Sequence, residues 1–180
     1  MSRVLPTLER GCLMFSFSMI PLSQVAGAAE NTHALLSLNP ELQTHGMILT
    51  EADVGALSIA RAQTLKSLGR IELDLTVTQE IARRLSASAY ITQDTLVQTI
   101  ADLYEIFHYI KNATSDHIPD VELLDALLLN YENFDGSTEL MLGKGIERIV
   151  ENYRQHASLS DFSMSDAEWK EMVDYWNFAE

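Results

Sequence analysis

Two pairs of side chains in this chain have the spacing of a carboxylate and imidazole metal site. Glu105 and His108 stand three residues apart, and Glu30 and His33 repeat that spacing. Diiron helix bundles take a glutamate and a histidine at this spacing from each of two helices, with all four side chains pointing inward. The two pairs are therefore the candidate ligands of a metal-dependent helical-bundle enzyme.

The pattern around the second pair argues against that chemistry. Apolar residues recur there at alternating spacings of four and three and form one helical stripe, made of Leu96, Ile100, Leu103, Phe107 and Ile110. Glu105 and His108 lie about 120° to 180° around the helix from the centre of this stripe. We therefore expect both side chains to point away from the core, and we predict no metal, no cofactor and no catalytic residue.

Arg61 is the second chemical feature, because it falls on an apolar helix face. That face carries Val54, Ser58, Leu65 and Leu68. Burying an unpaired guanidinium is costly, so Arg61 needs a carboxylate, and Glu72 and Glu105 are the candidates. We interpret the arginine as part of a structural ion pair. The alternative is an anion or small-ligand site in which Arg61 and Arg70 act with Glu72, Tyr90 and Glu105.

Other catalytic and phosphate-binding motifs are incomplete or missing. Gly143, Lys144 and Gly145 could present backbone amides to an anion, but the Ser or Thr of a phosphate-binding loop does not follow the lysine. No Gly-x-Ser-x-Gly elbow occurs, and Cys12 has no nucleophile motif around it. These patterns favour a protein that is not an enzyme.

The elements that must position these side chains are helices. The periodicity predicts helices over 22–37, 50–68, 78–87, 92–112, from 119 onward, and from 143 to about 156, with a short turn of helix after Ser137. Thr50 and Asp53 resemble a helix-capping pair, and the predicted first helix is closed by Asn39 and Pro40. Residues 69–75 give the only hint of a strand. The fold class is therefore all-α, an irregular bundle of about six helices with an additional C-terminal amphipathic helix.

That C-terminal helix differs in character from the rest. A capping-box pattern, Ser165 to Glu168, precedes an apolar stripe at helical spacing, made of Trp169, Met172, Val173 and Trp176. We predict that this stripe binds a partner groove, unless the helix packs on its own domain. The expected organisation is an N-terminal arm over 1–20, a helical domain over 21–156, and a linker with an acidic tail helix over 157–180.

Charge limits the classes of partner. The formal net charge of the 180 residues is -14, which disfavours nucleic acid and anionic membrane surfaces. Residues 113–180 carry fifteen acidic and four basic side chains, whereas residues 1–112 carry eleven and eight. This asymmetry indicates either a basic protein partner or selection for solubility.

The N-terminus leaves the compartment open between two alternatives. The lone Cys12 can form no internal disulfide, which fits a reducing cytoplasmic location. However, Arg3 and Arg10 precede an apolar run and the small residues 26–29, in the manner of a secretory signal. Glu9 and the serines within the run favour retention of this arm. We expect a cytoplasmic protein, with secretion after cleavage as the alternative.

A set of short motifs carries a family resemblance over about 110 residues. They are Gly46, Met47, Leu49 and Thr50; Arg61 and Leu65; Gly69, Arg70 and Glu72; Ser88, Tyr90 and Ile91; and Glu105, Ile106, Phe107, Tyr109, Lys111 and Asn112. The chain resembles a family of small bacterial proteins, mostly from anaerobic Gram-positive lineages, classified as a domain of unknown function. The family pattern has a tyrosine in place of His108. The resemblance implies a mostly helical cytoplasmic protein and no particular activity.

Together these patterns predict a non-enzymatic protein-interaction or adaptor protein. The alternative is a regulator that binds a small ligand or anion, and a metal-dependent enzyme is the least favoured of the three.

Overall fold

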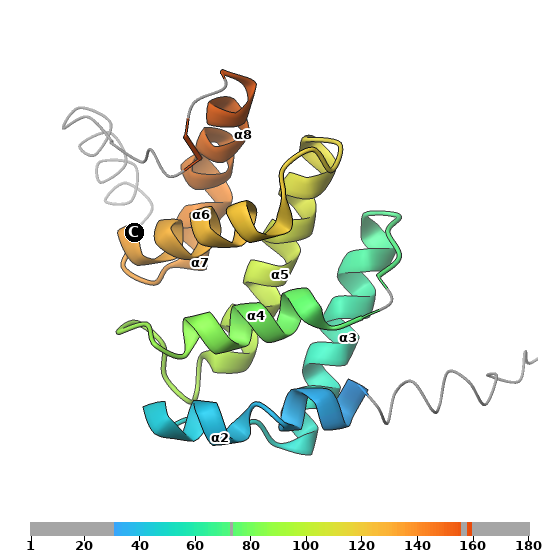
Figure 1. Cartoon of the computed structure of the whole chain (residues 1–180), viewed down its shortest axis with the longest axis vertical. Helices are drawn as coiled ribbons and strands as arrows, with labels where there is room; N and C mark the ends of the chain where they lie inside the picture. Colours follow the sequence, from blue (N-terminus) through green and yellow to red (C-terminus); the bar gives the residue numbers. More distant parts are fainter. Residues whose placement is uncertain (1–30, 73, 156–157, 160–180) are drawn as a thin grey trace, which may run out of the picture.

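The computed structural model of this chain describes residues 31–72, 74–155 and 158–159, and their fold is all-α, as predicted. Figure 1 shows the arrangement of the helices. Residues 31–36 are helical. The elements that follow are α2 (Asn39–Leu42), a 3-10 turn (Gln43–His45), α3 (Glu51–Ser67), α4 (Thr76–Leu85), α5 (Leu96–Ala113), α6 (Asp120–Asn133), α7 (Thr138–Leu140), a π-helical turn (Met141–Gly145) and α8 (Ile146–Arg154). The predicted tail helix and residues 22–30 of the predicted first helix lie outside the described residues.

α3 begins at the predicted cap. The Thr50 hydroxyl accepts a hydrogen bond from the Asp53 backbone amide at 3.2 Å, and the Asp53 carboxylate accepts one from the Thr50 amide at 2.8 Å. This reciprocal pair satisfies two donors that the first turn of a helix leaves open. α3 ends before Gly69, whose φ of +64° is the left-handed conformation that favours glycine.

The segment around Pro40 differs from the prediction. Asn39 and Pro40 do not close the fold's first helical segment but begin α2, because proline is well suited to the first turn of a helix. The Asn39 side chain donates to the Leu49 carbonyl at 2.8 Å and accepts from the Leu49 amide at 2.7 Å. Asn39 therefore connects α2 to the segment that leads into α3.

α5 is the central helix of the fold. It contacts α3, α4, α6, α7 and α8, and Figure 1 shows α3 along one side of it, with α4 and α6 crossing it. Its buried side chains point in almost every direction around the helix axis: Leu96, Thr99, Ile100, Leu103, Tyr104, Ile106, Phe107, His108, Ile110 and Lys111. The predicted single apolar stripe is thus only part of the buried surface, because neighbouring elements cover more than one face of α5.

The part after α6 packs closely against the loop before α5. Gly136 has a φ of +79°, and a Cβ at this position would lie 2.3 Å from the Cβ of Tyr90. Only glycine allows the turn after α6 to approach this loop so closely. Leu159, within the predicted linker, is buried in the same core.

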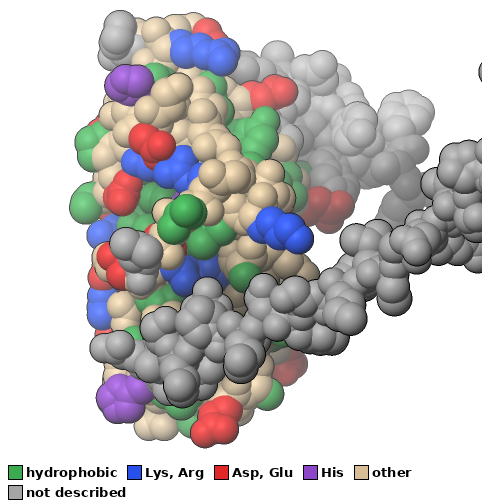
Figure 2. All heavy atoms as spheres, turned by 90° about the vertical axis from the view of Figure 1, so that its right-hand side faces the viewer, with side chains coloured by type: hydrophobic (Ala, Val, Ile, Leu, Met, Phe, Trp, Pro, Cys, Tyr) green, Lys and Arg blue, Asp and Glu red, His purple; other side chains and the backbone are tan. Residues whose placement is uncertain are grey.

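The segment between α3 and α4 contains no strand among its described residues, although the sequence over 69–75 hints at one. Figure 2 shows the face of the molecule on the α3 side, where Lys and Arg side chains lie beside Asp and Glu side chains with hydrophobic side chains between them. Among the described helices, none has the length and apolar character needed to cross a bilayer.

Candidate functional site

Arg61 forms the expected ion pair, and of its two candidate partners, Glu72 and Glu105, the structure shows Glu72 in that place. Arg61 lies on α3 and Glu72 on the segment that follows it. The Arg61 Nη2 and Nε atoms lie 2.9 Å and 3.1 Å from the Glu72 Oε2 atom. Arg61 also donates to the backbone carbonyls of Glu72 and Asp74. The guanidinium therefore holds the segment after α3 against that helix.

Tyr104, on α5, completes the environment of this carboxylate. Its hydroxyl donates a hydrogen bond to the Glu72 Oε2 atom. Burial by itself would raise the pKa of Glu72, but His108, Tyr104 and Arg61 together hold it below its ordinary value. Burial, together with the adjoining Glu72 carboxylate, raises the pKa of Tyr104 well above its ordinary value. Glu72 is thus held as a carboxylate and Tyr104 as a phenol.

His108 is buried, contrary to the expectation that it points away from the core. Its side chain is 5% exposed, and its ring meets those of Tyr104 and Phe107 edge to face, with centroids 4.4 Å and 5.2 Å away. The His108 Nε2 atom lies 3.8 Å from the Glu72 Oε2 atom, longer than a hydrogen bond, and neither ring nitrogen has a hydrogen-bond partner. The prediction was wrong because the packing of α3 and the segment after it covers this face of α5.

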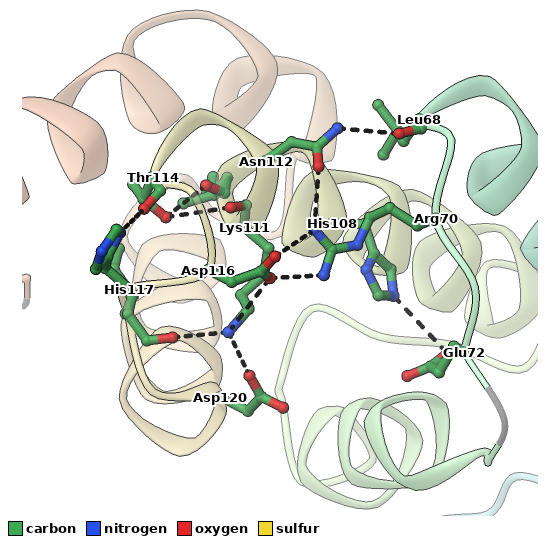
Figure 3. Close-up of polar contacts among 12 residues, drawn as sticks. Leu68, Arg70, Glu72, His108, Lys111, Asn112, Thr114, Asp116, His117 and Asp120 are labelled. Carbon is green, nitrogen blue, oxygen red and sulfur yellow. Dashed lines mark hydrogen bonds and ion pairs between the residues drawn. The ribbon is translucent and has the colours of Figure 1, made fainter.

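Arg70 forms a second ion pair next to the first (Figure 3). Its Nη2 and Nη1 atoms lie 2.6 Å and 3.1 Å from the two carboxylate oxygens of Asp116, in the loop between α5 and α6. Its Nη1 also donates to the Asn112 side-chain oxygen at 3.0 Å, while the Asn112 amide donates to the Leu68 carbonyl at 3.2 Å. The hydrogen bonds to Asp116 raise the pKa of Arg70.

Lys111 is the third cation of this region, and its side chain is only 9% exposed. Its Nζ atom donates to the Ile118 carbonyl at 2.8 Å and to the Asp120 carboxylate at 2.6 Å. It also lies 3.8 Å from the Asp116 carboxylate. Lys111 therefore joins the last turns of α5 to the loop 114–119 and to the first residue of α6. Arg70, Lys111, Asn112 and Asp116 together form the Arg70 cluster.

The structure brings only part of the predicted site together. Arg61 and Glu72 form one ion pair, and Arg70 belongs to the ion pair next to it. Tyr90 is not part of either pair, because its hydroxyl donates to Asp135, at the turn after α6. Glu105 is exposed and is not the partner of Arg61. The predicted partner-binding stripe, Trp169, Met172, Val173 and Trp176, lies outside the described residues, as does Glu30.

Sequence reasoning missed three residues that build these contacts. Tyr104 and Lys111 stand on α5 at positions that a single-stripe pattern assigns to the surface or leaves undecided. Lys111 does belong to the family motif that runs from Glu105 to Asn112, and this membership was the one indication in the sequence that it has a role. The role of Asp116 could not be predicted from the adjacent sequence. It depends on a left-handed backbone conformation, with φ of +61°, that no sequence pattern around it indicates.

Neither Glu72 nor Tyr104 has the pKa expected of a general acid or base near neutral pH. A general acid or base works best with a pKa near the operating pH, whereas the pKa of Glu72 is lowered and that of Tyr104 is raised, both away from neutrality. Over 31–72, 74–155 and 158–159, no three His, Cys, Asp or Glu side chains are grouped so that they could hold a metal ion.

Comparison with known proteins gives one match. The family model DUF6323, described as a family of unknown function, matches residues 34–159, which is well over half of the chain. The predicted resemblance to a family without assigned activity is thereby confirmed, while the distribution of that family among bacteria stays a prediction. Neither the comparison with curated proteins nor that with solved structures gives a match.

Proposed function

We propose that this chain, which belongs to the family of unknown function DUF6323, is a non-enzymatic protein-interaction protein. The observation that carries the proposal is Ile71, whose side chain is 89% exposed although both of its neighbours in the chain are fixed. Arg70, before it, binds Asp116 and Asn112, and Glu72, after it, binds Arg61 and Tyr104.

A single exposed isoleucine is ordinary on a protein surface, so the fixed neighbours matter more than the exposure. Because Arg70 and Glu72 are both held by the protein, the backbone between them has little freedom, and Ile71 is presented to solvent in a preorganised way. A rigid apolar anchor loses little conformational entropy when a partner covers it. This is the property expected of a residue at the centre of an interface.

A second exposed side chain lies next to the same contacts. Tyr109 is half exposed on α5, one turn before Asn112 on the same helix face. The hydrogen bond between Arg70 and Asn112 thus joins two segments that each expose a large apolar side chain, Ile71 and Tyr109. Tyrosine is enriched at protein interfaces because it has both an apolar ring and a polar end.

Two further features support a protein partner. The net charge of -14 favours a partner with a basic surface and disfavours nucleic acid. The stripe of Trp169, Met172, Val173 and Trp176 is a second proposed contact, in which an amphipathic helix would bind an apolar groove.

The test is quantitative capture from an extract of the native cell with the full chain and with Ile71→Ser. We expect one partner to be retained by the wild type and reduced at least about tenfold by the substitution, which corresponds to the loss of one apolar anchor. Ile59→Ser is the matched control, because Ile59 is also exposed and stands about 200° around α3 from Arg61. A chain that ends after Leu159, and so keeps this buried core residue, measures the contribution of the tail separately. An unchanged set of partners for Ile71→Ser and for the truncated chain would contradict the proposal.

A further inference from the structure

We propose that the Arg70 cluster is a binding site for a small oxyanion, a carboxylate or phosphate group, and that Asp116 occupies it as an internal substitute for that ligand. The proposal does not depend on the protein-interaction function. It rests on three observations. The Arg70 and Lys111 side chains are held in place by other groups, the Asp116 side chain is more exposed than either of them, and the buried ring of His108 has no hydrogen-bond partner.

The guanidinium of Arg70 is oriented before any ligand arrives. Asn112 accepts from its Nη1 atom and is itself fixed by donating to the Leu68 carbonyl. The two remaining contacts of the guanidinium go to the two oxygens of one carboxylate, at 2.6 Å and 3.1 Å. This forked geometry is the one with which arginine recognises free carboxylates and phosphates.

Lys111 adds a second positive charge at the same place. Its Nζ atom is fixed by the Ile118 carbonyl and Asp120, and it faces the Asp116 carboxylate at 3.8 Å without a hydrogen bond to it. Asp120 neutralises part of this charge. Removing Asp116 would leave Asp120 as the one carboxylate bonded to Lys111, while Glu72, which acts on Arg70 at longer range, is itself paired with Arg61. The cluster would then have a net positive charge within a chain of strongly negative net charge.

Asp116 itself is the least firmly attached member. Its side chain is 53% exposed, whereas that of Arg70 is 21% exposed and that of Lys111 is 9% exposed. Asp116 and the preceding Ser115 both have left-handed backbone conformations, with φ of +61° and +52°. Such conformations are unfavourable for residues other than glycine, although aspartate tolerates them better than most. Backbone hydrogen bonds hold this turn, among them the one from the Asp116 amide to the Lys111 carbonyl at 2.8 Å, so a ligand would replace only the Asp116 side chain.

His108 is the independent indication of a ligand. Both of its ring nitrogens are buried without a hydrogen-bond partner, which is costly inside a protein. The ring also lies close enough to Asp116 to act with Arg70 and Lys111 in lowering the pKa of that carboxyl, the hydrogen bond from Arg70 being the main cause. The His108 Nε2 atom faces the Glu72 carboxylate at 3.8 Å, so its Nδ1 atom is the buried polar atom near the proposed site that has no hydrogen-bond partner.

The experiment is a titration of the full chain with sodium phosphate and, separately, with sodium succinate, followed by amide chemical shifts. It compares the wild type, Asp116→Asn and Arg70→Gln at about 0.1 M salt, where long-range repulsion by the net charge is largely screened. Asparagine keeps the tolerance for the left-handed conformation and removes only the competing charge. The matched control is Asp125→Asn, which removes a similarly exposed carboxylate from Arg84 on another part of the surface.

We expect Asp116→Asn to bind at least one of the two anions about tenfold more tightly than the wild type, and Arg70→Gln to bind neither. Asp125→Asn should bind as the wild type does. In the wild type, a saturating anion should move the amide signals of residues 115–117 as Asp116 is displaced. A preference for succinate or phosphate would identify the ligand class. The proposal is overturned if Asp116→Asn gains no affinity, if Arg70→Gln retains it, or if the shifts map to another region.

Discussion

Two arginine and carboxylate pairs lie side by side in this protein, and they differ in how far each is closed to solvent. The Arg61 and Glu72 side chains are 14% and 16% exposed, whereas those of Arg70 and Asp116 are 21% and 53% exposed. The first pair connects a helix to the segment that directly follows it. The second connects that segment to a loop 46 residues further along the chain.

The two ion pairs also differ in the number of hydrogen bonds that surround them. The Glu72 carboxylate receives Arg61 and Tyr104, and Arg61 also donates to two backbone carbonyls. Removing Glu72 would therefore leave several groups unsatisfied in a largely water-free site. The Asp116 side chain is about half exposed, as the proposed replacement by an external anion requires. On this proposal, the first ion pair is a fixed support and the second is an exchangeable contact.

We call Arg61 and Glu72 the closed pair, and Arg70 and Asp116 the open pair. The largest expected effect is that of Glu72→Gln, which removes the negative charge from the closed pair. The variant leaves the Arg61 guanidinium partly buried without its counter-charge, and breaking a buried pair on one side typically costs about 3 kcal/mol or more. We expect the free energy of unfolding in urea to fall by that amount. The matched control is Asp116→Asn in the open pair, which should lose less than about 1 kcal/mol. Equal losses for the two variants would contradict the comparison.

Acid should remove the same contribution from the wild type. The folded-state pKa of Glu72 lies below its ordinary value of about 4.3, so the stability that it contributes is fully present above this pH and is lost as the pH falls through the folded-state pKa. The difference in unfolding free energy between the wild type and Glu72→Gln should be constant from about pH 7 to pH 5 and should narrow below about pH 4. Urea unfolding at a series of pH values measures it. A gap that widens in acid would mean that the pKa is raised instead.

The sequence predicts more of the closed pair than of the open one. Arg61 on an apolar helix face requires a carboxylate, and local reasoning reduces the candidates to Glu72 and Glu105, of which the structure shows Glu72. The fold class and the helix cap at Thr50 follow from equally local patterns. Arg70 and Asp116 meet only after α5 and the loop beyond it have packed, which no local pattern encodes.

The error over His108 has the same origin. Helical periodicity shows which face of α5 is most apolar, but it does not show that further elements cover the other faces. The ring is therefore buried where a single-stripe analysis places it at the surface. The sequence also predicts that Tyr90 acts with the arginines, whereas in the structure Tyr90 packs against Gly136 and its hydroxyl donates to Asp135.

Tyr104→Phe should have an intermediate effect on the closed pair. The variant keeps the ring packed against His108 and removes only the hydroxyl that donates to Glu72. A hydrogen bond to a charged group contributes about 1.5 kcal/mol or more, so we expect a loss of about that size in urea unfolding. The double variant Tyr104→Phe and Glu72→Gln should lose less than the sum of the single variants, because both remove the same hydrogen bond. Strict additivity would show that Tyr104 does not act through Glu72.

The smallest expected effect is the coupling between Arg70 and Asp116. In a double-mutant cycle of Arg70→Gln and Asp116→Asn, the interaction energy should be about 0.2 to 1 kcal/mol, since a half-exposed pair exchanges its contacts with water at little cost. Added salt should weaken it further, because a pair with one side open to solvent is screened. Urea unfolding of the four chains at low and high salt measures both quantities. A coupling above about 2 kcal/mol that does not respond to salt would make this pair a fixed support as well, and Asp116 would then be too firmly held for an external anion to displace it.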